Sequence, residues 1–285
     1  CFNFVCGFMA GFIGLEIVMK KFLLTIAYDG SDYIGWQRQD KLHGISIQQT
    51  VEKALSEVLR EQVAVQASGR TDSGVHALGQ TAHFVTEKAI PAENLPRALN
   101  NLLPASVRIL DACEVDEAFH ARFSVKEKTY RYYILLNEGQ IVTPFISRYV
   151  WVYPDRLDFE AMREATALFV GMHDFRRFCV TGSSVSTYER EIYRAELALS
   201  KAEFLPVGAT NREKLLCFEI CGSGFLYKMV RIIVARLIEV GQGRLNLADI
   251  CALLKGSEDY KSAVPAPPQG LFLYSTKYPT NILIK

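Results

Sequence analysis

The sequence lacks the features that most directly assign a chemistry. No glycine-rich loop follows a strand in the manner of a nucleotide cradle, no Cys-x-x-Cys pair occurs, and the 5 histidines are scattered. Nothing therefore indicates a nucleotide-binding fold, a metal site or a cofactor site. The 7 cysteines are odd in number, which favours reduced and buried thiols in a cytoplasmic protein over a disulfide framework.

Excess charge of one sign is also missing. The 32 Lys and Arg residues nearly balance the 31 Asp and Glu residues, so the formal net charge is only +1. This balance neither indicates nor excludes a polyanionic partner, and any nucleic-acid surface must be a local basic patch. The length of 285 residues suffices for one large domain or two ordinary ones.

A long apolar stretch occurs only at the beginning of the sequence. Residues 1–18 carry a single charge, Glu16, and Lys20 and Lys21 follow the stretch, whereas a signal peptide has its basic residues first. The stretch is near the lower length limit for a membrane-spanning helix. We expect an upstream extension, with the functional protein beginning at Met19 and no membrane partner. A membrane anchor is the alternative.

Strand and helix patterns alternate along the remainder, without repeats or a Gly/Ser/Pro-rich linker. The sequence predicts strands near residues 22–28, 63–67, 80–86, 107–115, 128–136, 191–199, 214–221 and 271–276. It predicts helices near residues 47–59, 95–102, 159–170, 226–240 and 247–254. Ser46 and Gln49 predict a capping box for the first helix, and Gly171 predicts a C-cap. We expect two α+β lobes, residues 19–122 and 123–285.

A nine-residue loop stands out between two strand-like segments. It reads Gly-Arg-Thr-Asp-Ser-Gly-Val-His-Ala from Gly69 to Ala77. In an extended segment Arg70 and Asp72 leave the same face, and a guanidinium beside a carboxylate favours the ionised acid. An ionised acid suits a nucleophile or a base. The alternative is a solvated ion pair in a turn, which contributes little.

Two further segments mix cations with apolar residues. The first interleaves Arg122, Lys126, Lys128 and Arg131 with Phe123, Tyr130, Tyr132 and Tyr133. Cations neutralise phosphates and rings stack on unpaired bases, so this mixture suits RNA. Composition alone favours the alternative, a strand with aromatic rings in the core and cations in water.

The second segment is the apolar helix near residues 226–240. It carries three cations, and two of them, Lys228 and Arg231, lie three residues apart and share a face. An arginine in the first turns of a largely buried helix is costly unless it is paired or lies in a cleft. The alternative to a site residue is an ion pair at an interface.

The loop at residues 69–77 resembles the signature of the tRNA pseudouridine synthase A family, Gly-Arg-Thr-Asp-(Ala or Ser)-Gly-Val-His-Ala. Other blocks similar to this family lie at residues 28–39, 119–124, 128–132, 225–241, which contains Met-Val-Arg at 229–231, and 266–271. The resemblance extends from about residue 21 to residue 278. Two departures, Tyr227 in place of a basic residue or His and Ala235 in place of Gly, affect no catalytic position.

This resemblance implies a fold and a set of site residues. The fold is α+β, with two ferredoxin-like lobes whose antiparallel sheets surround a central basic active-site cleft. Asp72 is the implied nucleophile and Arg231 its ion-pair partner. Arg70 helps to displace the target base and keeps Asp72 ionised, while Tyr130 stacks on the uracil.

The implied reaction converts uridine to pseudouridine at positions 38 to 40 of the tRNA anticodon stem-loop. It needs no cofactor and no metal, and the implied enzyme is a homodimer. The residues leave open which of the three positions reacts and whether Asp72 attacks the base or the sugar. Two alternatives are a synthase of the same chemistry with another RNA target and a non-catalytic tRNA-binding or folding module.

Overall fold

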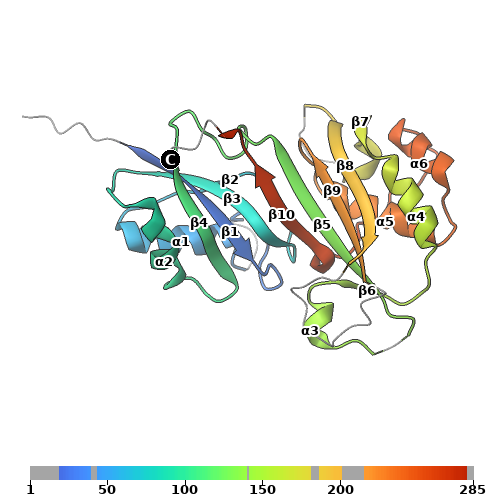
Figure 1. Ribbon diagram of the computed structural model, residues 1–285, viewed down its shortest axis with the longest axis horizontal. Helices are drawn as coiled ribbons and strands as arrows, with labels where there is room; N and C mark the ends of the chain where they lie inside the picture. The colour runs from blue at the N-terminus through green and yellow to red at the C-terminus, as the bar shows by residue number, and fades with distance from the viewer. Residues whose placement is uncertain (1–18, 40–43, 140, 181–185, 201–214, 281–285) are drawn as a thin grey trace, which may run out of the picture.

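A computed structural model describes residues 19–39, 44–139, 141–180, 186–200 and 215–280 (Figure 1). The predicted extension at residues 1–18 lies outside the described residues. The strands are β1 Lys20–Tyr28, β2 Gln66–Ala67, β3 His76–Thr86, β4 Val107–Val115, β5 Glu127–Leu136, β6 Trp151–Tyr153, β7 Gly171–Asp174, β8 Glu189–Leu199, β9 Leu215–Gly222 and β10 Leu271–Lys277. The α-helices are α1 Ile47–Leu59, α2 Leu95–Asn100, α3 Pro144–Ser147, α4 Phe159–Ala167, α5 Met229–Gly241 and α6 Leu247–Leu254.

The strands form one mostly antiparallel sheet with the order β4-β1-β3-β10-β5-β9-β8-β7, while β2 pairs with β3 and β6 with β5. In the first half, β1-α1-β2-β3-α2-β4 folds into the sheet order β4-β1-β3-β2. In the second half, the elements β5, β8, β9 and β10 take the matching order β10-β5-β9-β8. The last strand, β10, is parallel to β3 and antiparallel to β5, so it joins the two halves into one sheet.

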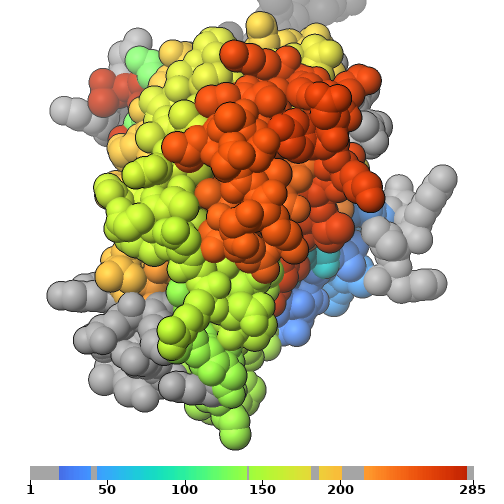
Figure 2. All heavy atoms as spheres, turned by 90° about the vertical axis from the view of Figure 1, so that its right-hand side faces the viewer, coloured from blue at the N-terminus to red at the C-terminus, as the bar shows by residue number. Residues whose placement is uncertain are grey.

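The main core lies between one face of the sheet and the long helices. It unites buried residues of α1 and α2 in the first half with those of α4, α5 and α6 in the second half. In Figure 2 the segment of α4 (yellow-green) lies beside that of α5 and α6 (orange) at the end of the molecule. Smaller clusters on the other face bury residues of the segments 142–153 and 119–121. Within the described residues, every helix is too short or too polar to cross a membrane.

Several sequence predictions are confirmed. α1 begins with the predicted capping box: the Ser46 side chain accepts from the Gln49 backbone N–H, and the Gln49 side chain accepts from the Ser46 N–H. The strands β1, β4, β5 and β10 and the helix α6 lie within a few residues of their predicted bounds. Strand β5 places Tyr130 and Tyr132 in the main core, as its alternation predicts.

Other predictions are wrong at element ends. α4 ends at Ala167, and Gly171 is no C-cap: its φ of +110° lets the chain reverse into β7. α5 begins at Met229 because Lys228 has a left-handed backbone (φ 60°), which interrupts the helix. The strand predicted near residues 63–67 shortens to β2. The short elements α3, β6 and β7 had no pattern long enough to predict them.

Candidate active site

In the structure the signature loop is the segment 68–75 between β2 and β3, and the last two residues of the signature, 76 and 77, begin β3. The loop rests on β1 and the segment that follows it. The Trp36 backbone N–H donates to the Thr71 carbonyl (3.1 Å), and the hydroxyls of Tyr28 and Thr71 are hydrogen-bonded at 2.8 Å. A Cβ atom on Gly35, whose φ is +106°, would lie 2.7 Å from the Thr71 carbonyl oxygen. This segment therefore fixes the path of the loop backbone. Burial raises the pKa of Tyr28 to about 12, so its hydroxyl is a neutral hydrogen-bonding group.

Asp72 points to the first turn of α5 and pairs there with Arg231. Arg231 Nη1 lies 2.8 Å from Asp72 Oδ2, and Arg231 Nε donates to the Ala266 carbonyl at 2.6 Å. The two side chains are 12% and 19% exposed, so the pair lies in a protected but open position. Among the described residues, Asp72 Oδ1 has no hydrogen-bond or ion-pair partner. The site thus holds one carboxylate oxygen and leaves the other free.

Tyr130 lies on β5, facing the main core and the loop. It is 8% exposed, and its ring meets that of Phe225 edge to face with centroids 5.0 Å apart. Burial raises the pKa of Tyr130 well above its usual value, and the nearby Tyr28 and Asp72 raise it further. Tyr130 therefore offers a neutral, rigid ring near the Asp72 carboxylate.

Arg70 differs from its expected place beside Asp72. Its side chain is exposed and lies outside the 4.0 Å ion-pair distance of any carboxylate in the described part of the chain. The expectation assumed an extended segment, whereas the loop turns here, with the Val75 N–H donating to the Asp72 carbonyl at 3.2 Å. Arg231 takes the partner role, and among the described residues no carboxylate pairs with the Arg70 guanidinium.

Two other polar residues of the loop region have structural contacts. Ser73 Oγ donates to the Tyr33 carbonyl at 3.0 Å. His76 is 1% exposed, and its ring stacks on Phe272 (4.7 Å) and tilts against Tyr149 (5.3 Å). Both residues therefore shape the loop and its exit into β3.

The basic-aromatic segment does not form a single surface, because alternate residues of β5 face opposite sides of the sheet. Arg131 Nε pairs with Glu219 at 2.6 Å, and Tyr133 lies in a smaller core on the face away from the long helices. Lys128 and Tyr130 lie on the face of the signature loop. Only part of the segment therefore faces the signature loop.

Sequence reasoning missed several supporting residues. Gln80 is fully buried on β3, where its amide donates to the Gly69 carbonyl (2.9 Å) and accepts from Ser68 Oγ (2.8 Å). A buried glutamine in an apolar strand is a usable signal, since buried polar groups need partners. Phe225, in contact with Tyr130, begins the family block at residues 225–241, but the sequence gave it no role.

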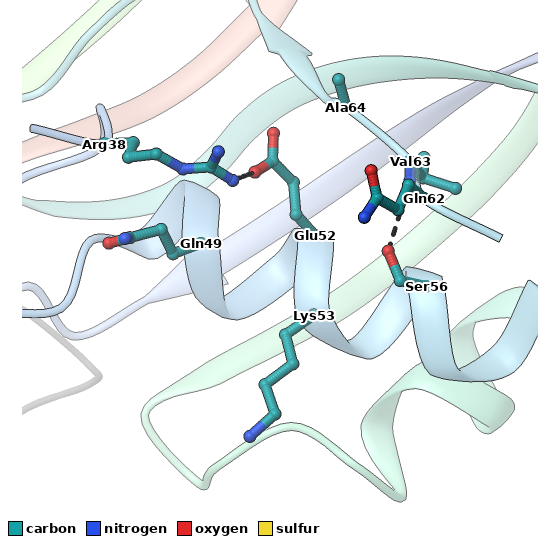
Figure 3. A pocket seen from close by; sticks show the side chains of 8 residues that line it. All are labelled: Arg38, Gln49, Glu52, Lys53, Ser56, Gln62, Val63 and Ala64. Atoms are coloured by element: carbon teal, nitrogen blue, oxygen red, sulfur yellow. Dashed lines mark hydrogen bonds and ion pairs between the residues drawn. The ribbon is translucent and has the colours of Figure 1, made fainter. Parts of the chain in front are cut away.

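A cavity of about 480 Å³ lies beside α1, away from the signature loop (Figure 3). Its floor is Glu52, which accepts from Arg38 and from the Val65 N–H (3.1 Å). It is lined by Arg38, Gln49, Glu52, Lys53, Ser56, Gln62, Val63 and Ala64, none of which belongs to the signature loop. Its buried carboxylate is already satisfied by protein groups. The described residues contain no group of three His, Cys, Asp or Glu that could hold a metal ion.

A mostly antiparallel α+β fold with this loop and this acid–arginine pair corresponds to the pseudouridine synthase class. The sequence model of a family described as tRNA pseudouridine synthase matches residues 24–124 and 165–279. Proteins named tRNA pseudouridine synthase A from Moorella thermoacetica and Geobacter sp. (strain M21) are each 41% identical to this chain. The alignments cover 90% of this chain and 98% of the Moorella protein, and 92% of this chain and 100% of the Geobacter protein. The chain belongs to the tRNA pseudouridine synthase family.

Proposed function

We propose that this protein is an isomerase that converts uridine to pseudouridine in the tRNA anticodon stem-loop, at positions 38 to 40. The observation that carries the proposal is the Asp72–Arg231 ion pair. It joins the acid of the signature loop to an arginine 159 residues away, at the start of α5. The names of the similar proteins supply the substrate class, tRNA.

Asp72 is the nucleophile in this mechanism. Arg231 holds Oδ2, so the free Oδ1 is directed at the substrate. The Asp72 carboxylate forms a bond to the base or the sugar, and this bond breaks again before the product leaves. The bond from ribose C1′ to uracil N1 breaks, the uracil turns, and C1′ bonds to C5, which loses its proton while N1 takes up a proton. The product has the same atoms as the substrate, and no electrons are gained or lost overall. The reaction balances without a redox partner or a group donor.

In this proposal Tyr130 binds the target base, and Arg70 helps to displace it from its stack. A base that reacts must leave its stack and be held in a pocket. The buried Tyr130 ring, fixed against Phe225, offers a surface for the uracil. Arg70, exposed and unpaired within the described residues, can occupy the space that the base vacates.

We further propose that each half is a ferredoxin-like lobe, that the lobes divide near residues 122 and 123, and that a basic cleft lies between them. The matching strand orders of the two halves support this view. The homodimeric state and the cytoplasmic location stay predictions. Sedimentation equilibrium at micromolar concentration checks the first, because a homodimer has twice the chain mass of 32.1 kDa.

Tritium release tests the proposed reaction. Unmodified tRNA with tritium at uracil C5 is incubated with the protein, and the tritium that enters water is counted. We expect release by the wild type, none by Asp72→Asn, and similar tRNA affinity for both, because Asn keeps the shape of Asp but is no nucleophile. Release by Asp72→Asn would refute the role of Asp72. Binding without release by the wild type would instead indicate a tRNA-binding module.

A further inference from the structure

Lys128 is a cation in contact with the signature loop that the proposed mechanism does not use. It lies on β5 two residues before Tyr130, on the same face and about 7 Å along the strand. Lys128 Nζ donates to the Ser68 carbonyl at 2.6 Å, and a Cβ atom on Gly69 would lie 3.2 Å from it. The ammonium group therefore packs against the residues that lead to Arg70 and Asp72.

Lys128 has no carboxylate partner in the described part of the chain. None lies within 4.0 Å of Nζ, although the side chain is partly buried and charges removed from water are normally paired. Burial, together with the smaller effect of the positive charge of Arg122, lowers the pKa of Lys128 to about 8. Arg70 and Arg122 are exposed and likewise have no carboxylate partner in the described part of the chain. Lys128 and Arg122 are thus close enough for their charges to interact, and Arg70 follows directly after Gly69, which Lys128 approaches.

Such a group suits an anion that arrives with the substrate. An ammonium group has three donors, and the Ser68 carbonyl takes one of them. A nucleotide whose base lies on Tyr130 brings its own backbone phosphates into the neighbourhood of the next side chain along β5. A phosphate oxygen would supply the missing counter-charge and accept the remaining donors.

We propose that Lys128 binds a backbone phosphate next to the target uridine and so fixes the position of that nucleotide relative to Asp72 and Tyr130. The inference rests on the proposed function, because it takes the reacting base to lie on Tyr130. The alternative is a purely structural role, in which Lys128 only holds the Ser68 carbonyl by a hydrogen bond. That role would affect the stability of the loop but not the recognition of a phosphate.

A double-mutant cycle between protein and RNA separates these roles. Full-length tRNA is prepared by ligation with one neutral methylphosphonate, on the 5′ or the 3′ side of the target uridine. We expect one of these two changes to weaken wild-type binding about tenfold, the effect of losing one charge-assisted contact. Lys128→Met should bind unmodified tRNA about tenfold more weakly and lose less than about twofold from the same methylphosphonate.

Two control variants distinguish a specific phosphate contact from a general loss of charge or of folding. Lys53→Met removes an exposed lysine of α1 that points away from the Arg38–Glu52 pair (Figure 3), so its cycle should resemble that of the wild type. Lys128→Gln removes the charge but keeps a hydrogen-bond donor. It replaces Lys128→Met in the cycle if Lys128→Met does not fold. Equal losses in the wild type and in a folded Lys128 variant, at both linkages, would overturn the inference. Tritium release by the wild type in the same preparations shows whether the proposed function itself stands.

Discussion

The ion pair between Arg231 and Asp72 yields the sharpest prediction from the structure. Arg231 donates to Asp72 Oδ2 and to the Ala266 carbonyl, and a hydrogen bond to a charged group contributes about 1.5–3 kcal/mol. Arg231→Lys keeps the charge but reaches one acceptor, so we expect a loss of about tenfold in the single-turnover rate. Arg231→Met leaves a carboxylate that is 19% exposed without its partner. Loss of this charged hydrogen bond, about 1.5–3 kcal/mol, predicts a rate about 10- to 150-fold lower.

Single-turnover tritium release with excess enzyme measures these rates without interference from product release. Thermal unfolding and tRNA affinity are measured on the same proteins, so that a folding defect is recognised. Arg244→Met is the matched control, because Arg244 is exposed and lies beyond the other end of α5, about 20 Å away. It should stay within about twofold of the wild type. A folded Arg231→Met that keeps more than a third of the rate would show that the pair is only structural.

Two further predictions concern the support of the loop and the stability of the fold. Gly35→Ala would place a Cβ atom 2.7 Å from the Thr71 carbonyl at a φ of +106°, so we expect a loss of at least about 2 kcal/mol in unfolding free energy, together with slower tritium release. Gly243→Ala, at a φ of +69° with open space around it, isolates the backbone strain, and equal losses in the two variants would contradict the proposed clash. Burial, together with the smaller effects of the charges of His120 and Lys21, lowers the pKa of His83 from 6.5 to about 4. The native state therefore binds fewer protons than the unfolded state, and urea unfolding should show up to about 3 kcal/mol lost as the pH falls from 6.5 to 4. His83→Gln should flatten this dependence relative to a control substitution of the partly exposed His173, and an unchanged slope would count against the assignment.

Local signals predicted much of the fold. The capping box of Ser46 and Gln49 and the apolar stripe of α1 involve residues close in sequence. The local sequence pattern is therefore sufficient to predict this helix. Element ends depended on single backbone conformations. The left-handed backbone of Lys228 is unusual for a residue with a side chain, and no sequence rule places it before Met229.

The candidate site was less predictable from the residues themselves. The resemblance to a known family identified Asp72, Arg70, Tyr130 and Arg231 as site residues. The partner of Asp72, however, depends on contacts between segments that are distant in sequence. Spacing alone favoured Arg70, two residues away, whereas the structure places Arg231 there. Alternation along β5 separates Lys128 and Tyr130 from Arg131, a division that composition could not reveal.

The segment 266–271, which the sequence marked without giving it a role, explains how the distant parts of the site stay together. Its first residue accepts a hydrogen bond from the Arg231 side chain and donates its own N–H to the Arg231 carbonyl at 3.1 Å. The Pro267 carbonyl accepts from the Tyr132 hydroxyl at 2.7 Å, and a Cβ atom added to Gly74 would lie 2.9 Å from the ring of Pro268. The segment then continues into β10, which pairs with both β3 and β5. Asp72, the tyrosines of β5 and the start of α5 are therefore positioned by one continuous stretch of chain, and the geometry of the site depends on the closing of the sheet by its last strand.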